Sequence, residues 1–166
     1  MQRLWAPWRM EYVGGAHDAG GCLFCDALAD ADAAKRLVLW RGPLAFVMLN
    51  RYPYAHGHLM IAPVTHVADP AGLTPAEGQE LMRLVGECTR RLTEAMAPHG
   101  FNVGMNLGRV AGAGVEGHLH LHVVPRWNGD TNFMPVLADV RVMPQHLADT
   151  YAALAPRFAA LPPPDR

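Results

Sequence analysis

Three histidines at strict period two constrain this chain more than any other feature. His118, His120 and His122 alternate with Leu119 and Leu121 in the run GHLHLHVVPR. Successive side chains of a β-strand point to opposite faces, so the pattern predicts a strand with one apolar face and one row of imidazoles. A single histidine on a strand is usually a satisfied polar residue, whereas this evenly spaced triple indicates a functional site.

The spacing of the row limits what it can bind. Alternate strand residues lie about 6.6 Å apart, which puts His118 and His122 on the order of 13 Å apart at the backbone. The three cannot readily converge on one zinc ion, because Zn–N distances are roughly 2.0–2.1 Å. Two neighbours can share an ion, so a histidine-lined catalytic metal site remains an alternative. A separation of roles suits the geometry better: one nitrogen attacks, another binds or protonates an oxygen, and a third orients or ligates.

The composition is that of one globular domain. The chain has 166 residues, of which 51% are hydrophobic and 17% charged, enough to bury a core without disulfide bonds. The formal net charge is −1 and no long Lys/Arg run occurs, so the electrostatic footprint of a duplex-binding protein is missing. The N-terminus lacks the apolar core of a signal peptide, and no apolar stretch reaches the ~20 residues of a membrane span. We therefore expect a cytoplasmic protein with no membrane or nucleic-acid partner.

Two of the three cysteines, Cys22 and Cys25, have the C-x-x-C spacing of metal ligands or of a redox pair. The redox interpretation requires a following thioredoxin-like βαβ pattern, which the sequence lacks. Two unligated thiols in a loop remain the alternative to a metal site. The third cysteine, Cys88, lies on the apolar stripe of a predicted helix, so we expect it in the core.

Hydrophobic periodicity predicts an α+β fold on an antiparallel sheet of about five strands. Three strands are expected at 37–41, 44–50 and 58–62, joined by short connections that favour antiparallel pairing. Alternation over 101–107 predicts a fourth strand, whose apolar face can join that of the histidine strand.

The clearest helix begins at Thr74, with Pro75 at its first position and Glu77 completing a capping box. An apolar stripe continues along one face of this helix until Pro98 and Gly100 end it. The stripe consists of Leu81, Leu84, Val85, Cys88, Leu92 and Met96.

The chain is expected to form a single domain over 1–166, with an N-terminal arm at 1–21, a core at 22–133 and a C-terminal extension at 134–166. A shorter helix is predicted within 145–161. Two tryptophans of the arm, Trp5 and Trp8, are candidate anchors on a partner subunit. Surface or turn positions are expected for His17, His56, His58, His99 and His146, although His56 and His58 lie near a motif that could approach the site.

These patterns resemble the histidine triad (HIT) family, whose signature is His-x-His-x-His flanked by apolar residues and often followed by Pro-Arg. The resemblance covers roughly residues 20–130, including 46–50, 57–63 and the helix that follows. Further similarity, to the bacterial branch that contains diadenosine tetraphosphate phosphorylases, lies in residues 2–10, 99–108 and 122–133.

The resemblance implies a covalent mechanism. His120 would be the nucleophile that takes a nucleoside monophosphate, and His122 would contact the phosphoryl or bridging oxygen. Asn50 matches the position that hydrogen-bonds the ribose hydroxyls. Asn106 and the loop containing Gly114 would surround the phosphates, because glycines let backbone N–H groups approach anionic oxygens.

One position departs from the family pattern. Many triad hydrolases carry a glutamine four residues before the first histidine, where this chain has Gly114. The missing amide disfavours ordinary hydrolysis of the intermediate and favours inorganic phosphate over water as the acceptor.

The resemblance also implies a zinc site. Cys22 and Cys25 match a half-site that a histidine of a Pro-x-x-His stretch and the first triad histidine complete. Here these are His66 and His118, and His118 is at the same time a member of the catalytic row. With four protein ligands no position is open for substrate, so the implied zinc is structural. No organic cofactor is implied.

We therefore predict an enzyme that cleaves dinucleoside polyphosphates through a nucleotidyl-histidine, with phosphate slightly favoured over water as acceptor. One alternative is a hydrolase of dinucleotides or nucleoside phosphoramidates that uses the same nucleophile. A non-enzymatic alternative is a zinc-stabilised nucleotide sensor or adaptor with little turnover. Family members generally pair as two-fold dimers, so we expect a homodimer.

Overall fold

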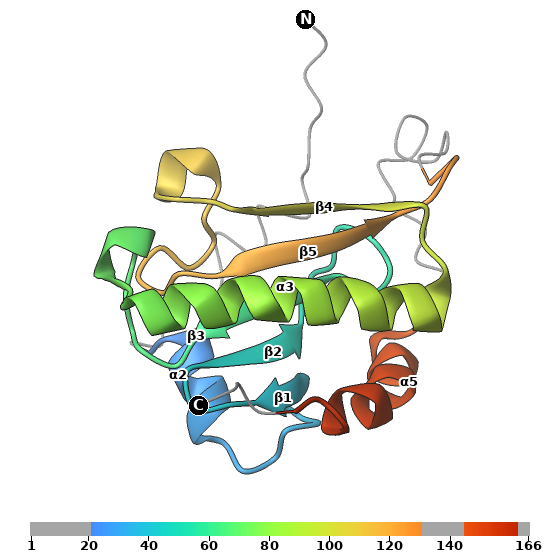
Figure 1. Ribbon diagram of the computed structural model, residues 1–166, viewed down its shortest axis with the longest axis horizontal. Helices are drawn as coiled ribbons and strands as arrows, with labels where there is room; N and C mark the ends of the chain where they lie inside the picture. Colours follow the sequence, from blue (N-terminus) through green and yellow to red (C-terminus); the bar gives the residue numbers. More distant parts are fainter. Residues whose placement is uncertain (1–20, 131–144, 163–166) are drawn as a thin grey trace, which may run out of the picture.

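The computed structural model describes residues 21–130 and 145–162. Trp5, Trp8 and His17 lie outside the described residues. In the described part, a five-stranded antiparallel sheet has the strand order β1-β2-β3-β5-β4 (Figure 1), which confirms the predicted α+β fold. The strands are β1 (Val38–Arg41), β2 (Ala45–Leu49), β3 (Leu59–Pro63), β4 (Gly100–Met105) and β5 (Leu121–Arg126).

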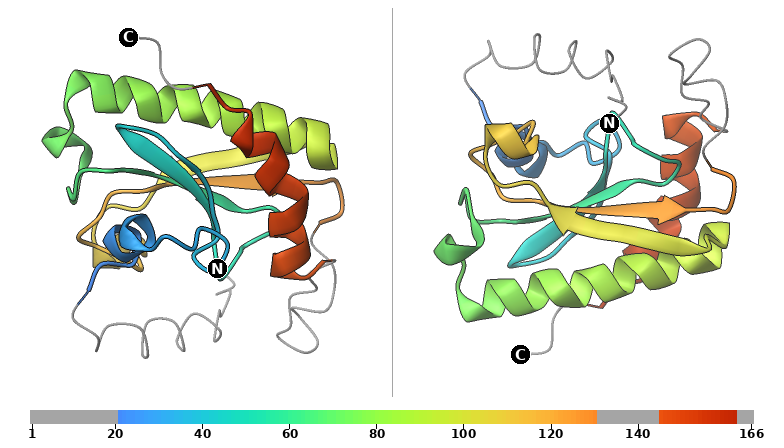
Figure 2. Two further views of the ribbon diagram at one scale, coloured as in Figure 1. Left: turned by 90° about the horizontal axis from the view of Figure 1, so that it is seen from below. Right: turned by 90° about the horizontal axis from the view of Figure 1, so that it is seen from above.

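Helices lie on both faces of this sheet. Figure 2 shows the long helix α3 along one face and the short helix α2 on the other. The helices are α2 (Leu23–Ala29), α3 (Pro75–Met96) and α5 (Leu147–Ala159), with 3-10 turns η1 (Pro70–Gly72) and η2 (Arg109–Ala111). The sequence did not predict α2, because its seven residues are too few for a helical period to show and its N-cap makes no side-chain hydrogen bond.

Alternating side chains of the central strands enter two different cores. Val47 and Leu49 of β2 belong to the core that α3 and α5 cover. Phe46 and Met48, on the opposite face, pack in a second core with Phe24 of α2. The period-two alternation of strands thus buries β2 completely.

Helix α3 begins as the sequence predicts. The Thr74 side chain accepts a hydrogen bond from the Glu77 backbone N–H, and the Glu77 carboxylate accepts from the Thr74 backbone. Thr65, in the loop after β3, also donates its hydroxyl to Glu77. The helix ends at Met96, and its C-cap residue, Ala97, has a left-handed backbone with a φ of 47°. Glu77 therefore joins the start of α3 to the loop that follows β3.

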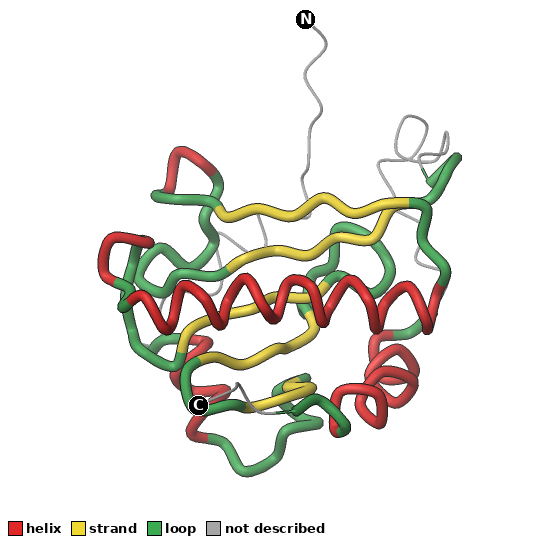
Figure 3. The backbone as a smooth tube through the Cα atoms, viewed as in Figure 1, coloured by secondary structure: helices red, strands yellow, loops and turns green. Residues whose placement is uncertain are grey.

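The histidine row only partly occupies a strand. β5 begins at Leu121, so His118 and His120 lie in the irregular segment just before it, which Figure 3 draws as loop. The alternation nevertheless holds, because Leu119 and Leu121 are buried in the core beneath α3. The opposite side carries the imidazoles, toward the face covered by α2.

β4 forms the sheet edge beyond β5, and its apolar side chains are only partly covered. Phe101 packs against the core, whereas Val103 and Met105 are 43% and 37% exposed. The pairing of β4 with β5 confirms the predicted strand, but its apolar face joins the core less fully than predicted. Among the described helices, none combines the length and apolar character that crossing a membrane requires.

Candidate active site

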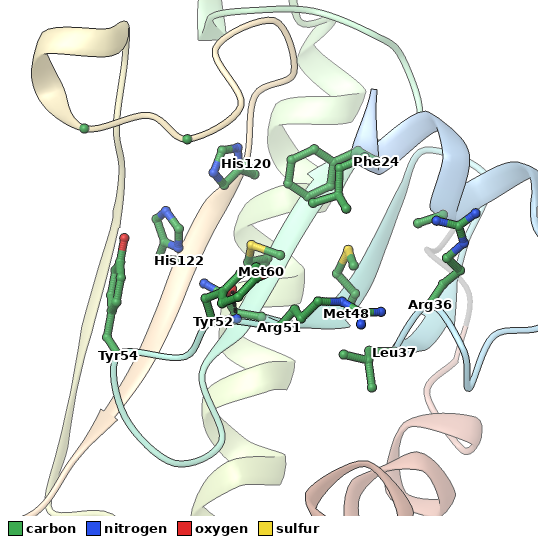
Figure 4. Close-up of a pocket in the computed structure, with 15 residues that line it drawn as sticks. Phe24, Arg36, Leu37, Met48, Arg51, Tyr52, Tyr54, Met60, His120 and His122 are labelled. Carbon is green, nitrogen blue, oxygen red and sulfur yellow. Dashed lines mark hydrogen bonds between the residues drawn. The ribbon is translucent and has the colours of Figure 1, made fainter. Parts of the chain in front are cut away.

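A pocket of about 200 Å³ lies on the face of the sheet that carries α2. His120 and His122 line it on one side (Figure 4). Gly112 and Gly114, from the loop before them in the chain, also line it. This volume is below the roughly 300–1,000 Å³ of sites that enclose a drug-sized ligand. Its other lining residues are Leu23, Phe24, Ala27, Arg36, Leu37, Met48, Asn50, Arg51, Tyr52, Tyr54 and Met60.

His120 is held in one tautomer by the backbone. Its Nδ1 lies 2.9 Å from the carbonyl oxygen of His118, which can only accept, so Nδ1 donates. The neutral ring then carries a lone pair on Nε2. Burial lowers the pKa of His120, against the opposing effect of the hydrogen bond to His118, so the neutral form is favoured at pH 7. The ring of Phe24 packs 4.8 Å from the imidazole, centroid to centroid.

His122 is held by a fourth histidine. His58 Nε2 lies 2.9 Å from His122 Nδ1. The other nitrogen of His58, Nδ1, accepts hydrogen bonds from the Tyr54 backbone N–H at 3.0 Å and from Asn50 Nδ2 at 3.4 Å. A neutral His58 therefore carries its proton on Nε2 and donates it to His122. This leaves His122 Nδ1 as the acceptor and puts its own proton on Nε2.

The surface or turn role expected for His58 is wrong, whereas its noted approach to the site is confirmed. Its side chain is 0% exposed, and it contacts both His122 and Asn50. The register contains the signal, because Met60 of β3 pairs with His122 of β5, and His58 lies two residues before Met60. The pairing of two strands distant in sequence was needed to place the two rings together.

Four side chains form a compact cluster at the other end of the histidine row. The ligand atoms of Cys22, Cys25, His66 and His118 all lie within 4.8 Å of one another. Nδ1 of His118 lies 3.3 Å from Cys22 Sγ and 3.6 Å from Cys25 Sγ, and His66 Nδ1 lies 3.2 Å from Cys25 Sγ. A tetrahedral zinc site separates its ligand atoms by roughly 3.3–3.8 Å. The cluster therefore fits a metal ion of this kind.

The His118 ring is oriented for such a role. Its Nε2 lies 2.9 Å from the carbonyl oxygen of Pro63 and donates to it, so Nδ1 is left with a lone pair toward the thiols. Burial lowers the pKa of His118, which favours the neutral ring. Cys22 is the N-cap of α2 and Cys25 lies within the helix, so the same cluster ties α2 to the sheet.

The other residues predicted from the sequence differ in whether they line the pocket. Asn50 and Gly114 line the pocket, as their expected nucleotide-binding role requires. Asn106 does not line the pocket. Its Nδ2 donates a hydrogen bond to the Gly112 carbonyl at 3.4 Å, so it stabilises the loop that carries Gly112 and Gly114. Cys88 is 0% exposed in the core, as expected.

Three further histidines lie where the sequence predicts them. His99 and His146 are exposed, and His56 is partly exposed in the turn before β3.

Several pocket residues had no signal in the sequence alone, because they come from the undetected helix α2 and from loops. They are Phe24, Arg36, Arg51 and Tyr54.

Comparisons with known proteins agree with this geometry. The HIT domain family matches residues 32–129. A Mycobacterium tuberculosis protein named AP-4-A phosphorylase is 40% identical over 169 aligned residues, covering 98% of this chain and 87% of the relative. An adenosine 5'-monophosphoramidase of Schizosaccharomyces pombe is 30% identical and covers 64% of this chain and 75% of its own. The crystal structure of a Zn-bound histidine triad family protein from Mycobacterium smegmatis has a TM-score of 0.66 and 27% identity, covering 84% of this chain and 94% of that one.

Proposed function

Because this chain belongs to the HIT domain family, we propose that it cleaves dinucleoside polyphosphates such as diadenosine tetraphosphate, with His120 as the nucleophile. The single observation that carries the proposal is the fixed tautomer of His120. Its Nδ1 proton is held by the His118 carbonyl, and Nε2 keeps a lone pair in a ring that lines the pocket. A neutral imidazole with a free nitrogen attacks phosphorus, whereas an imidazolium does not.

The first step exchanges one bond for another. His120 Nε2 attacks the α-phosphorus of a bound diadenosine tetraphosphate, and the anhydride bond to the β-phosphate breaks. His122 Nε2–H is the proton donor to the leaving oxygen, because His58 occupies its Nδ1. The products are ATP and an adenylyl group on His120. Gly112 and Gly114 border the position of the phosphates and leave room for backbone N–H groups to approach them.

The second step depends on the acceptor. Attack by an oxygen of inorganic phosphate breaks the N–P bond and gives ADP, whereas attack by water gives AMP. We propose phosphate, because Gly114 offers no side-chain amide beside the intermediate and the relative with 40% identity is named a phosphorylase. His120 leaves neutral in either case.

The cluster of two cysteines and two histidines stabilises the segment that carries the nucleophile. We propose that Cys22, Cys25, His66 and His118 hold a structural zinc ion, which supplies four strong ligand bonds between α2, the loop after β3 and the histidine row. His118 is the shared element, since its ring faces the thiols and its carbonyl holds His120.

We also propose that the protein is a homodimer and that it acts in the cytoplasm. The partly exposed apolar residues of the edge strand β4 support pairing with a second copy. They are Val103, Met105 and, just beyond the strand, Leu107. Phosphoramidate hydrolysis with the same nucleophile is the second candidate function, favoured by the similarity to the Schizosaccharomyces pombe monophosphoramidase.

Incubation of the purified protein with diadenosine tetraphosphate, with and without inorganic phosphate, tests the function. Anion-exchange separation should yield ADP and ATP only when phosphate is present. AMP and ATP without phosphate would show a hydrolase instead. Nucleotide binding without turnover of either this substrate or adenosine phosphoramidate would favour a sensor.

A further inference from the structure

Two arginines line the side of the pocket that lies away from the catalytic histidines. Figure 4 shows Arg36 opposite the side that carries His122 and Tyr54, and the Arg51 side chain running toward Met48. The mechanism proposed above uses neither guanidinium.

Most of the donors on these two side chains are not used within the described residues. Arg51 donates from Nη2 to the Lys35 carbonyl at 3.2 Å and forms no ion pair with a described carboxylate. Arg36 donates from Nε to Asp30 Oδ2 at 2.8 Å, which anchors the side chain and leaves its terminal nitrogens unused there. A guanidinium has five N–H donors and no acceptor. The arginine side of the pocket is therefore rich in donors.

The position of a nucleotide follows from the other side of the pocket. This step rests on the proposed function, which places the phosphorus at His120, and on the ribose-binding role that the family resemblance implies for Asn50, a residue that lines the pocket. The base then lies toward the arginines, between the apolar side chains that line this part of the pocket. Those side chains are Phe24, Leu37, Met48 and Met60.

We propose that Arg36 and Arg51 select the base by reading an edge that offers adjacent acceptors, so that guanine is preferred over adenine. Guanine presents N7 and O6 side by side, and a guanidinium donates to both. Adenine presents N7 beside an amino group, which is a donor and meets the donors of the arginines. The planar fork of arginine, rather than its charge alone, makes this distinction.

Binding of GMP and AMP measured by calorimetry tests the proposal without turnover. The wild-type protein should bind GMP roughly tenfold more tightly than AMP, the size expected for one good bidentate contact. Arg51→Met should bring the two dissociation constants within about twofold. Arg51→Lys should retain affinity for both nucleotides and lose most of the preference, because it keeps the charge and loses the fork. Equal or tighter binding of AMP by the wild type would overturn the proposal, as would a preference that Arg51→Met leaves intact.

A matched control is Arg157→Met, which removes an exposed arginine of α5 whose guanidinium bonds its own helix. It should leave the ratio of the two dissociation constants unchanged. Turnover of diguanosine and diadenosine tetraphosphates in the presence of inorganic phosphate tests the proposed function separately from the proposed base selection. If neither is cleaved while GMP is still preferred, the proposed function fails and the base selection stands. If diadenosine tetraphosphate is cleaved at least as efficiently as the guanine substrate, the base selection fails and the function stands.

Discussion

The two ends of the histidine row use the same residue type for opposite purposes. His118 turns its free nitrogen to Cys22 and Cys25, away from the pocket. His122 lines the pocket and receives a hydrogen bond from His58. In both rings the role is decided by which partner occupies the other nitrogen, a carbonyl in one case and a histidine in the other. The spacing in the sequence makes the rings equivalent, and the packing makes them different.

His120 lies between the two ends, and its removal should have the largest effect on activity. His120→Ala should lower kcat/KM for diadenosine tetraphosphate by about 10⁴-fold or more, because the lone pair that attacks phosphorus is removed. Metal content and melting temperature should stay near those of the wild type. His99→Ala, an exposed histidine, is the control and should keep full activity. More than about 1% residual activity in His120→Ala would assign the nucleophile elsewhere.

The end at His118 can be broken by removing both thiols. Cys22→Ser with Cys25→Ser should reduce bound zinc from about one ion per chain to nearly none and lower the free energy of unfolding by about 4 kcal/mol. Turnover by the molecules that stay folded should fall less than tenfold, because the ion does not contact the substrate. Metal analysis and urea unfolding measure the two effects.

Cys88→Ala is the matched control, since this buried cysteine lies in the other core. It should lose some stability and keep its zinc. A double serine variant as stable as the wild type, with equal metal content, would contradict a structural site at this end.

The end at His122 can be broken by removing its partner. His58→Leu should lower kcat about 100-fold, because His122 loses the donor that fixes its proton on the pocket side. Zinc content should not change. His58→Gln retains an N–H donor and should recover part of the loss, whereas His56→Leu should be nearly silent. Activity of His58→Leu within threefold of the wild type would show that His122 needs no such partner.

A smaller effect is expected at the loop that carries His66. Glu77→Ala removes the capping box and the bond from Thr65, which should cost about 1 kcal/mol at pH 7. The hydrogen bonds from Thr65 and Thr74 lower the pKa of Glu77 in the folded protein. Their stabilisation is therefore complete above the unfolded value of about 4.3 and is lost as the pH falls through the lower folded pKa.

Urea unfolding of the wild type and Glu77→Ala with a chelator present, at pH 7 and below pH 4, measures this difference. The gap between the two should shrink at low pH. A gap that is constant with pH would mean that the carboxylate contributes nothing through its charge.

Local patterns in the sequence predict much of this molecule. The period-two run places Leu119 and Leu121 in one core, and the capping residues locate the start of α3. His58 could not be assigned in the same way, because its partner lies 64 residues away and only the register of β3 and β5 brings the rings together. The pocket wall from α2 was missed for a related reason, since seven residues carry too little periodicity.

The bond from His120 to the His118 carbonyl has an evolutionary consequence. A peptide oxygen is present whatever side chain the residue bears, so no single codon change deletes the acceptor that sets the tautomer of His120. The tautomer of His122 depends instead on one gene position, that of His58. A single substitution at His58 can therefore alter proton delivery by His122 in descendants of this gene. The tautomer of His120, by contrast, is kept wherever the backbone keeps this conformation.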